Sequence, residues 1–543
     1  MDAKKLREEA DELFSKRSSL VMLWQETADN FYVERADFTV NRSLGTDFAA
    51  HLQTSYPVLC RRELGDQIGS MLRNTAKPWF EMVVRDRPKL DHDAKKWLQW
   101  ATGTQRRAMY DPVTQLTRAA KEGDHDFAAF GQCVISTEVV KYSHLLYRCW
   151  HLRDVAWMEN ENGDTGFVSR KWKPRARDLV RMFGSKVDPK ITRLAEKKPF
   201  EECNVYHVVC DADMYDADAR GKPRWSIYYD CENNKVIEAT PIRTRIYRIP
   251  RWQTVSGSQY AFSPATVAAL PDGRLLQAMT LTLLEAGEKI VNPPLVGTVD
   301  AVRSDMAVFA GGVTWIDREY DERMGEALRP MTIDAKGMPL NHELIRDTRS
   351  MIMQAFYLNK LTLPQRGAEM TAYEVGQRVQ EYIRGALPLF EPMEMSYNGG
   401  LCEETFENML YAGGFGSPTD MPESLRDADI QFQFVSPLHD AIEQSKGQKF
   451  LEMKQLLAEA VSVDQNAAAV PDVITAFRDA MDGIGVPAKW VRSEDESKAI
   501  VRQNNEQIQQ QQLLDSLEQS SKTAANLTKA QEMGDTMVGA QAA

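Results

Sequence analysis

Apolar residues in the first 130 positions recur at the spacing of an α-helix. Leu6 and Ala10 lie on one face of the opening segment, with charged residues on the opposite face. The same spacing continues over residues 57–73, 95–108 and 113–130. These patterns predict a helical N-terminal part.

Residues 131–255 instead follow the two-residue period of β-strands and are rich in β-branched and aromatic side chains. Asn162-Gly163 and Asn233-Asn234 are typical of the turns in β-hairpins. The pattern predicts a mainly β region interrupted by one helix, from Ala176 to Phe183. With helices on either side of it, the expected fold class is α+β and mainly helical.

Helical spacing returns after Pro271. Asp272 is the expected N-cap of a helix that runs to Val291, where Asn292-Pro293-Pro294 would end it. A second apolar helix is predicted from Leu340 to Tyr357. The intervening segment of about 45 residues has only short, mixed hydrophobic patterns and many turn-forming residues. Two long helices therefore bracket a small insert.

Beyond the second apolar helix, a loop over residues 358–369 precedes a capping box formed by Thr371 and Glu374. The box opens a long helix that extends to about Ala412 and that its internal prolines must kink or break. Those prolines are Pro388 and Pro392.

The C-terminal part combines one strand with further helix. A strand is predicted over Asp429–Val435, and helical spacing over residues 440–492. The last 45 or so residues are rich in Gln, Ser and Ala and lack aromatic residues. This composition fits either one long helix or a disordered tail.

Composition narrows the class of protein. The 543 residues are too many for one core, and 66 Lys and Arg against 78 Asp and Glu give a net charge of −12, which argues against a simple basic nucleic-acid-binding domain. The seven cysteines are scattered without metal-ligand spacing, which indicates reduced thiols. An apolar run of about 18 residues is absent, so we expect no membrane span, and the charged N-terminus is unlike a signal peptide.

Motifs for catalysis or cofactor binding are missing. The sequence lacks phosphate-binding loops, dinucleotide-binding glycines and zinc-protease motifs. Asp91-His92-Asp93 and Asp124-His125-Asp126 are interpreted as solvated helix ends, because adjacent helical residues point about 100° apart. The acidic run Asp211–Asp218 departs from the calcium-loop pattern. We therefore expect no catalytic residue, no metal and no cofactor.

Basic residues cluster in two places. One cluster surrounds a predicted strand–helix junction between Arg170 and Arg181. In the other, Arg243 and Arg245 would share one face of a strand. The favoured interpretation is a solvated or intersubunit salt-bridging face, with contact to DNA phosphates as the alternative.

Four segments, in this order along the chain, carry a family resemblance. LGDQIGSMLRNTAKPWFEM (64–82) ends a helix in a Pro-Trp-Phe turn, and FAAFGQCVISTE enters the β region. Residues 248–296 contain Arg-Trp, a Ser-Pro turn, a Leu-Pro-Asp start, a long helix and Pro-Pro. The last segment is MTAYEVGQRVQEY (370–382). Together they resemble the head-to-tail connector (portal) proteins of short-tailed bacteriophages.

The resemblance implies a portal fold whose subunits form a ring, usually of twelve, around a central channel. The regions it implies are a wing (1–271, its β-rich part about 131–255), a stem helix (272–291), a clip (292–339), a second stem helix (340–357), a tunnel loop (358–369), further wing (370–439), a crown (440–495) and a Gln-rich tail (496–543). It places Asn359, Lys360 and Arg366 in the tunnel loop, facing DNA.

The same resemblance implies a non-enzymatic role in the virion, at one capsid vertex, after assembly in the host cytoplasm. The implied partners are double-stranded DNA, the terminase large subunit, tail adaptor or nozzle proteins, and the major capsid and scaffolding proteins. Two alternatives stay open. One is a different virion structural protein, such as a tail adaptor or internal protein. The other is a nucleic-acid enzyme, which would need clustered carboxylates for two metal ions.

Overall fold

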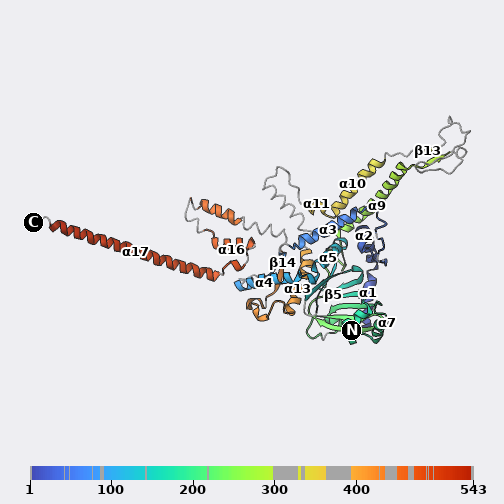
Figure 1. Ribbon diagram of the computed structural model, residues 1–543, viewed down its shortest axis with the longest axis horizontal. Helices are drawn as coiled ribbons and strands as arrows, with labels where there is room; N and C mark the ends of the chain where they lie inside the picture. Colours follow the sequence, from blue (N-terminus) through green and yellow to red (C-terminus); the bar gives the residue numbers. More distant parts are fainter. Residues whose placement is uncertain are drawn as a thin grey trace. The chain divides into compact units, whose positions relative to one another are not determined.

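The structure is a computed structural model of the 543-residue chain (Figure 1). The residues it describes are 3–297 except 42, 44, 48, 76–77, 86–90, 141–143 and 217–218; 328–331; 337–361; 393–434 except 427; and 449–539 except 461, 463–469, 485, 487 and 493. The chain divides into two compact units. The first comprises Met1–Val83, Thr102–Pro418 and Gln431–Leu438, and the second Val84–Ala101, Thr419–Ile430 and His439–Ala543.

The helical N-terminal part is confirmed. Its helices are α1 (Ala3–Lys16), α2 (Ser18–Phe31), α3 (Tyr56–Leu72), α4 (His92–Met109) and α5 (Leu116–Phe130). Gly131 ends α5 in the left-handed region, at a φ of 72°, and its amide donates to the carbonyl of Phe127. Only glycine fits there, because a Cβ atom would collide with the backbone of Phe262.

The β region is also confirmed, as two antiparallel sheets. In one, β2 (Val134–Val140) pairs with β3 (His144–Trp150) and with β9 (Tyr247–Arg248). The other is a five-stranded meander of β4 (Val155–Glu159), β5 (Thr165–Trp172), β6 (Val205–Asp211), β7 (Arg224–Asp230) and β8 (Lys235–Ile242). Both expected turns occur: Gly163 and Asn234 have φ values of 77° and 51° at the β4–β5 and β7–β8 connections.

One connection of the meander is longer than the sequence pattern indicates. Between β5 and β6 the chain forms the expected α6 (Ala176–Phe183) and also α7 (Pro189–Lys197). The Asp188 carboxylate caps α7 by accepting from the amide of Lys190, and Pro189 occupies its first turn. The apolar faces of both helices pack on the sheet through a cluster that includes Leu179, Ile191 and Val205.

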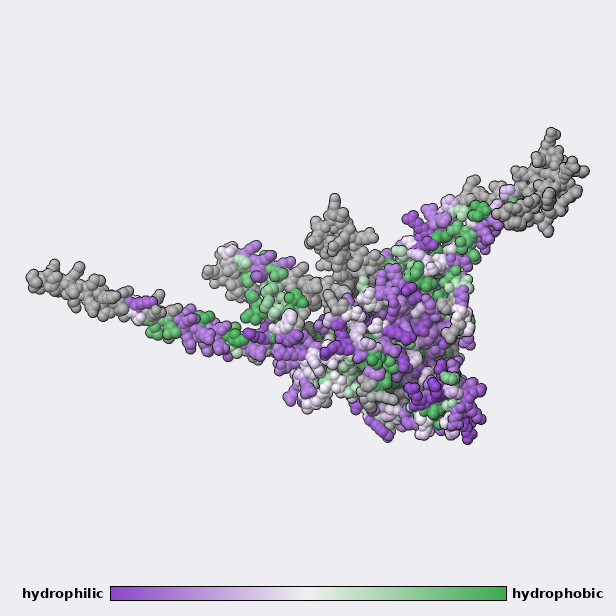
Figure 2. All heavy atoms as spheres, viewed as in Figure 1, coloured by the Kyte–Doolittle hydropathy of each residue, from purple (hydrophilic) through white to green (hydrophobic). Residues whose placement is uncertain are grey.

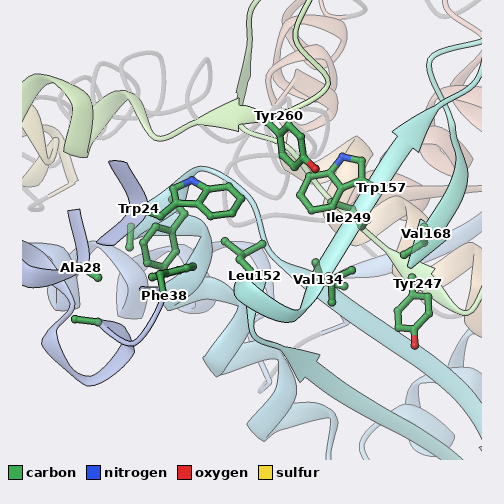
Figure 3. Close-up of a cluster of buried hydrophobic side chains, with 14 of the residues drawn as sticks. Trp24, Ala28, Phe38, Val134, Leu152, Trp157, Val168, Tyr247, Ile249 and Tyr260 are labelled. Carbon is green, nitrogen blue, oxygen red and sulfur yellow. The ribbon is translucent and has the colours of Figure 1, made fainter. Parts of the chain in front are cut away.

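A core of the described residues joins the helical part to both sheets (Figure 3). Trp24 of α2 packs against Phe38, Phe130 and Tyr260, with ring centroids 5.6, 6.4 and 6.0 Å away. Trp157 of β4 lies 4.4 Å from Tyr260 on the other side. Tyr260 therefore connects the end of the β region to both layers just before the chain enters a helix of 28 residues.

That helix, α9 (Pro264–Val291), begins eight residues before the predicted start. The expectation that Asp272 is its N-cap is wrong. Ser263 is the N-cap instead, because its side chain accepts from the amide of Thr266 and Pro264 is in the first turn. Pro271 is accommodated inside the helix.

The start of α9 is fixed to the end of α5 by buried hydrogen bonds. Ser263 Oγ donates to the carbonyl of Ala128 at 2.7 Å, and Thr266 Oγ1 donates to that of Ala129 at 2.8 Å. Further along, the Gln277 side chain accepts a hydrogen bond from the amide of Thr54 and donates one to the carbonyl of Thr54. The first half of α9 is thus anchored in the first unit.

The second apolar helix is α10 (Gly337–Ala355), which packs along α9 (Figure 1). Beyond α9, β12 (Leu295–Gly297) pairs antiparallel with β13 (Leu328–Pro330). Most of the region interpreted as a clip, including residues 298–327 and 332–336, lies outside the described residues. The capping-box motif at 370–382 and the prolines Pro388 and Pro392 lie outside them as well.

The described end of the long helix after the capping box is irregular. Residues Glu394–Gly399 form a π-helical stretch that continues as α13 (Gly400–Tyr411). The wider π turn lets the adjacent Tyr397 and Asn398 both point inward, and both are about 1% exposed. The strand expected at 429–435 is confirmed as β14 (Ile430–Phe434), which pairs with β1 (Phe80–Val84).

The second unit contains helical residues 449–460, α16 (Val473–Gly483) and α17 (Glu494–Gly539). Phe450 and Phe477 lie 5.5 Å apart between the first two of these. The Gln-rich tail forms one helix of 46 residues, so of the two states left open by its composition the structure adopts the helical one. Among the helices that the structure describes, none combines the length and hydropathy needed to cross a membrane.

Candidate functional site

The paired helices α9 and α10 share a buried seam. On α9, Leu276 is buried, and Gly273 lies against the Phe31 ring of α2. On α10, Ile345 and Ile352 are buried seven residues apart, and the buried Phe356 follows just after the helix ends. Phe356 also packs against Phe31 of α2, with ring centroids 5.4 Å apart. The seam accounts for only part of the apolar surface that the two helices carry.

The remaining apolar side chains are uncovered, and Figure 2 shows them gathered over α9 and α10. Leu284 is 56% exposed and Leu340 is 62% exposed. The large apolar residues exposed on the described part of the two helices are Val267, Leu275, Leu281, Leu284, Ile290, Val291, Leu340, Leu344, Met351 and Met353. Such a contiguous apolar surface is typical of a protein–protein interface.

These uncovered side chains lie on both sides of the pair. Leu275 and Leu284 are nine residues apart on α9, which is about 180° around a helix with 3.6 residues per turn. On α10, Met351 and Met353 likewise point about 160° apart. The helical pair therefore has two different apolar flanks, one on each side.

The chain turns sharply at the base of α10. Tyr357 has a φ of 58°, in the left-handed region, and Leu358 is buried just after it. Residues Leu358–Leu361 form the short helix α11, in which Asn359 is exposed. Lys360 belongs to α11 by its backbone, and Arg366 lies outside the described residues.

Arg243 and Arg245 do not share a strand face, so that expectation is wrong. β8 ends at Ile242, and the following bend sends the two guanidinium groups to different partners. Arg245 forms two hydrogen bonds with the Asp164 carboxylate, of 3.0 and 2.6 Å. Arg243 lies 5.1 Å from the ring centroid of Tyr411. Both therefore have partners within the subunit.

The triplet Asp124-His125-Asp126 is buried in α5, which contradicts its interpretation as a solvated helix end. Each member meets a different arginine. Asp124 pairs with Arg73, His125 accepts from Arg61, and Asp126 binds Arg35 through two hydrogen bonds of 3.0 and 2.9 Å. The 100° separation of neighbouring helical residues distributes the three groups among partners from different segments.

Two glycines of α3 make this cluster possible. A Cβ atom at Gly65 would collide with the His125 ring, and one at Gly69 would lie 2.8 Å from the Asp124 carboxylate. The helices α3 and α5 can therefore approach with charged side chains between them. Asn398 of the π-helical stretch completes the cluster, because its Oδ1 accepts from Arg73 at 2.7 Å.

Burial sets the protonation of the imidazole in this cluster. Burial and the nearby Arg61 guanidinium lower the pKa of His125 to about 4, so the ring is neutral near pH 7. A neutral ring can accept from Arg61 through Nδ1, at 3.0 Å, and direct Nε2–H toward Asp66. The cluster is therefore a fully paired structural link and lacks a residue poised for proton transfer.

Glu404 of α13 has a different environment. It is buried, and within the described part of the chain neither carboxylate oxygen has a hydrogen-bond partner. Burial raises the pKa of Glu404 to about 8, against the opposing effect of Arg248 and Arg245. The group is therefore largely protonated near neutral pH.

The other acidic sequences do not assemble a metal site. Asp211 pairs with Arg224 at 3.2 Å, and Asp93 is at the first turn of α4. Among the described residues, no group of three His, Cys, Asp or Glu side chains converges as metal ligands would. All seven cysteines, each of them described, are free thiols.

The sequence also matches a protein family, described as "Bacteriophage head to tail connecting protein", over residues 3–491. The chain belongs to this family. The connector is thus a structural component of a phage particle. This match confirms the resemblance that four short segments had indicated.

Individual relatives agree with the family. The connector is 25% identical over 542 residues to the probable portal protein of Bordetella phage BPP-1, covering 95% of this chain and 93% of the relative. It is 20% identical over 462 residues to the portal protein of Salmonella phage epsilon15, covering 81% and 80%. A chain from the virion of a native gene transfer agent particle matches at 10% identity and a TM-score of 0.35, with 81% and 95% covered.

Sequence reasoning missed two features of these surfaces. The sequence pattern does not tell which apolar residues of α9 and α10 lie in the buried seam and which lie on the exposed flanks, because seam and flanks are both rich in leucine and methionine. The buried charges of α5 did have a signal: Gly65 and Gly69 are four residues apart on one face of α3, which indicates a close helix approach.

Proposed function

We propose that the connector forms a closed ring at one vertex of the phage capsid, and that double-stranded DNA passes through the centre of the ring during packaging and ejection. The observation that carries this proposal is the pair of uncovered apolar flanks on α9 and α10. In a ring, one flank of each subunit packs against the opposite flank of the next, so every flank is covered without an open end. A ring of twelve subunits is the expected count.

The proposed regions follow the family's organisation. The helical pair is the stem, and residues 292–339 are the clip. Residues 358–369 are the tunnel loop, and the N-terminal and β parts with residues 370–439 are the wing. Residues 440–495 are the crown, followed by the tail at 496–543. The 46-residue helix α17 supports the proposal that the tails form a helical barrel, because such a barrel is built from one long helix of each subunit.

The mass of the native assembly tests the ring. Twelve copies of the 61.6-kDa chain give a closed particle of about 740 kDa with a central hole. Native mass spectrometry or particle imaging of the purified protein reports this mass directly. A neighbouring subunit number would still fit a ring. A protein that stays monomeric or dimeric under all conditions, including with scaffolding protein present, would overturn it.

Charge supports a conduit that holds DNA weakly. A net charge of −12 per subunit repels phosphates within about one Debye length, roughly 8 Å in physiological salt. The proposal is that only a few residues of the tunnel loop, Asn359, Lys360 and Arg366, contact the DNA. Arg243 and Arg245 remain candidates for contacts with a neighbouring subunit or with phosphate.

A double variant tests the tunnel loop. Replacing Lys360 and Arg366 by Gln removes two charges per subunit, and we expect altered packaging rate or DNA retention in particles assembled with the variant. The matched control replaces the exposed Lys5 and Lys235 by Gln, which removes the same two charges elsewhere. Unchanged packaging and retention in the double variant would exclude these two residues as DNA contacts.

The proposed conduit is not an enzyme, so energy for DNA movement must come from a separate motor. The terminase large subunit is the expected motor, docking on the clip, and tail adaptor or nozzle proteins are expected to take its place later. Major capsid and scaffolding proteins would contact the wing during assembly in the host cytoplasm.

A further inference from the structure

The outer face of α6 and α7 is strongly basic in an acidic protein. Between residues 173 and 198 the chain has nine Lys and Arg against three Asp and Glu, whereas the whole chain has an excess of acidic residues. The opposite faces of the two helices are apolar and packed on the five-stranded sheet. All of the excess positive charge therefore points away from the sheet into solvent.

Most of these cations have no acidic partner within the subunit. Lys186 pairs with Glu238 at 2.6 Å, and Lys198 lies 3.4 Å from Glu201. In the described part of the chain, the remaining exposed cations of the two helices form no ion pair. They are Arg177 and Arg181 on α6 and Lys190, Arg193 and Lys197 on α7.

The α7 cations form one stripe. Lys190, Arg193 and Lys197 are three and four residues apart, so they lie along a single helical face and span about 10 Å at 1.5 Å per residue. Like charges at this spacing repel one another and destabilise the isolated helix. A face of this kind is stabilised when a partner supplies carboxylates or phosphates opposite it.

An exposed aromatic ring lies beside two of the arginines of the basic face. Phe200 is 62% exposed, although it is large and apolar. The guanidinium groups of Arg175 and Arg177 both lie 5.4 Å from its ring centroid. The amide of Arg177 also binds the carbonyl of Pro199 at 3.3 Å, so Phe200 is located where the start of α6 meets the end of α7.

The exposed phenyl group of Phe200 distinguishes between the two possible acidic partners, duplex DNA and an acidic polypeptide. The backbone of duplex DNA presents phosphates and sugars and offers little apolar surface to an exposed phenylalanine. Protein interfaces, in contrast, are enriched in aromatic residues and arginine at their centre and are charged at their rim. An exposed Phe200 next to two arginines, on a face rich in cations, fits an acidic polypeptide that also carries an apolar side chain.

We infer that the face formed by α6, α7 and Phe200 is a docking surface for an acidic, phenylalanine- or leucine-containing segment of a partner protein. Carboxylates of the segment lie against the Lys190–Arg193–Lys197 stripe, and its apolar side chain covers Phe200. This inference does not depend on the proposed ring, because the surface belongs to one subunit and lies on the β meander.

The test uses the full-length protein and two labelled synthetic peptides of Glu and Ala, one of which also carries two Phe residues. Fluorescence anisotropy in about 150 mM salt, where the Debye length is about 8 Å, reports binding. A labelled DNA duplex is the third probe. We expect the Phe-containing peptide to bind more tightly than the peptide without Phe and more tightly than the duplex.

Two variants locate the binding. Lys190→Gln, Arg193→Gln and Lys197→Gln together should weaken binding of the Phe-containing peptide about tenfold, and Phe200→Ala about fivefold. The matched control replaces the exposed Lys5, Lys235 and Lys289 by Gln, which removes the same charge elsewhere and should leave affinity within about twofold. The mass of each assembly is measured in the same samples, so a failure of the ring is distinguished from a failure of this surface.

Three results would overturn the inference. Equal peptide affinity in the patch variant and the control variant would place binding elsewhere. Tighter binding of the duplex, lost in the patch variant, would identify a nucleic-acid surface. A change of assembly mass in the patch variant, with unchanged peptide affinity, would identify a second copy of the chain as the occupant.

Discussion

The charged cluster between α3 and α5 and the apolar flanks of α9 and α10 differ in where their partners lie. In the cluster, Asp124, His125 and Asp126 each have a partner inside the subunit. On the flanks, Leu284 and Leu340 are more than half exposed among the described residues. The first region has its partners within the chain, whereas the second is the proposed interface with a neighbouring subunit. Substitutions in the cluster should therefore lower the free energy of unfolding, whereas substitutions on the flanks should lower the fraction of protein that assembles.

The largest effect is expected for Asp124→Ala. Removal of the carboxylate leaves the Arg73 guanidinium buried without its counter-ion, which costs about 3–5 kcal/mol of unfolding free energy. Urea denaturation followed by tryptophan fluorescence measures the change. Glu122→Ala is the control on the same helix, since its pair with Arg118 is exposed and contributes less than about 1 kcal/mol. Similar midpoints for the two variants would show that the buried pair is not a major structural link.

A second prediction concerns pH and Glu404. Its pKa is about 8 in the folded protein, above the ordinary 4.5, so folding is favoured at low pH and this contribution is lost as pH rises through 8. Wild-type stability should decline between about pH 5 and pH 8 by at most about 1.4 kcal/mol per unit from this group. Glu404→Gln, neutral throughout, should show a shallower decline.

The control for this pH dependence is Glu8 of α1, which is exposed and is not among the groups that act on Glu404. Glu8→Gln should keep the wild-type slope of unfolding midpoint against pH. If Glu404→Gln also keeps that slope, the carboxyl is not held protonated in the folded subunit.

The close approach of α3 and α5 predicts opposite outcomes for two glycines. Gly69→Ala places a Cβ atom 2.8 Å from the Asp124 carboxylate and should destabilise by about 1–3 kcal/mol. Gly103→Ala, in α4 with open space around it, should stabilise by up to about 1 kcal/mol through helix propensity. Thermal unfolding of both variants measures the contrast, and a shift of equal sign would contradict it.

The smallest effect on the subunit is expected for Leu284→Gln on a flank. Because Leu284 is exposed, subunit stability should change by less than about 0.5 kcal/mol, while the fraction of protein in the ring falls. Native mass spectrometry measures that fraction. The buried Leu276→Ala has the reverse profile, with a loss of about 2–5 kcal/mol in unfolding free energy. A full yield of rings from Leu284→Gln would remove this flank from the proposed interface.

Sequence patterns predicted which helices and strands form better than they predicted which residues contact one another. The period-two alternation and the Asn-Gly turn located the β meander, and the apolar stripes located α9 and α10. The start of α9 was predicted eight residues late, because Pro271 was taken as a boundary although Ser263 provides the cap. The helix α7 was missed because its nine residues follow α6 after only a short turn.

The burial and pairing of a residue depend on contacts between segments that are distant in the sequence. Hydrophobic periodicity does not report these contacts. Asp124 has the sequence context of a solvated residue, but it is buried in an ion pair with Arg73, and Arg73 in turn donates to Asn398, which is 325 residues further along the chain. Arg245 likewise depends on Asp164, 81 residues away. The tunnel-loop residues were assigned by family resemblance and remain a proposal.

The anchored base of α9 has a mechanical consequence. Its 28 residues extend about 42 Å, and the two hydrogen bonds from Ser263 and Thr266 fix one end to the carbonyls that terminate α5. A tilt of the helix by about 5° at this base would displace its far end by roughly 4 Å. A small rearrangement near the end of α5 would thus become a larger movement at the far end of α9, without unfolding any turn of the helix.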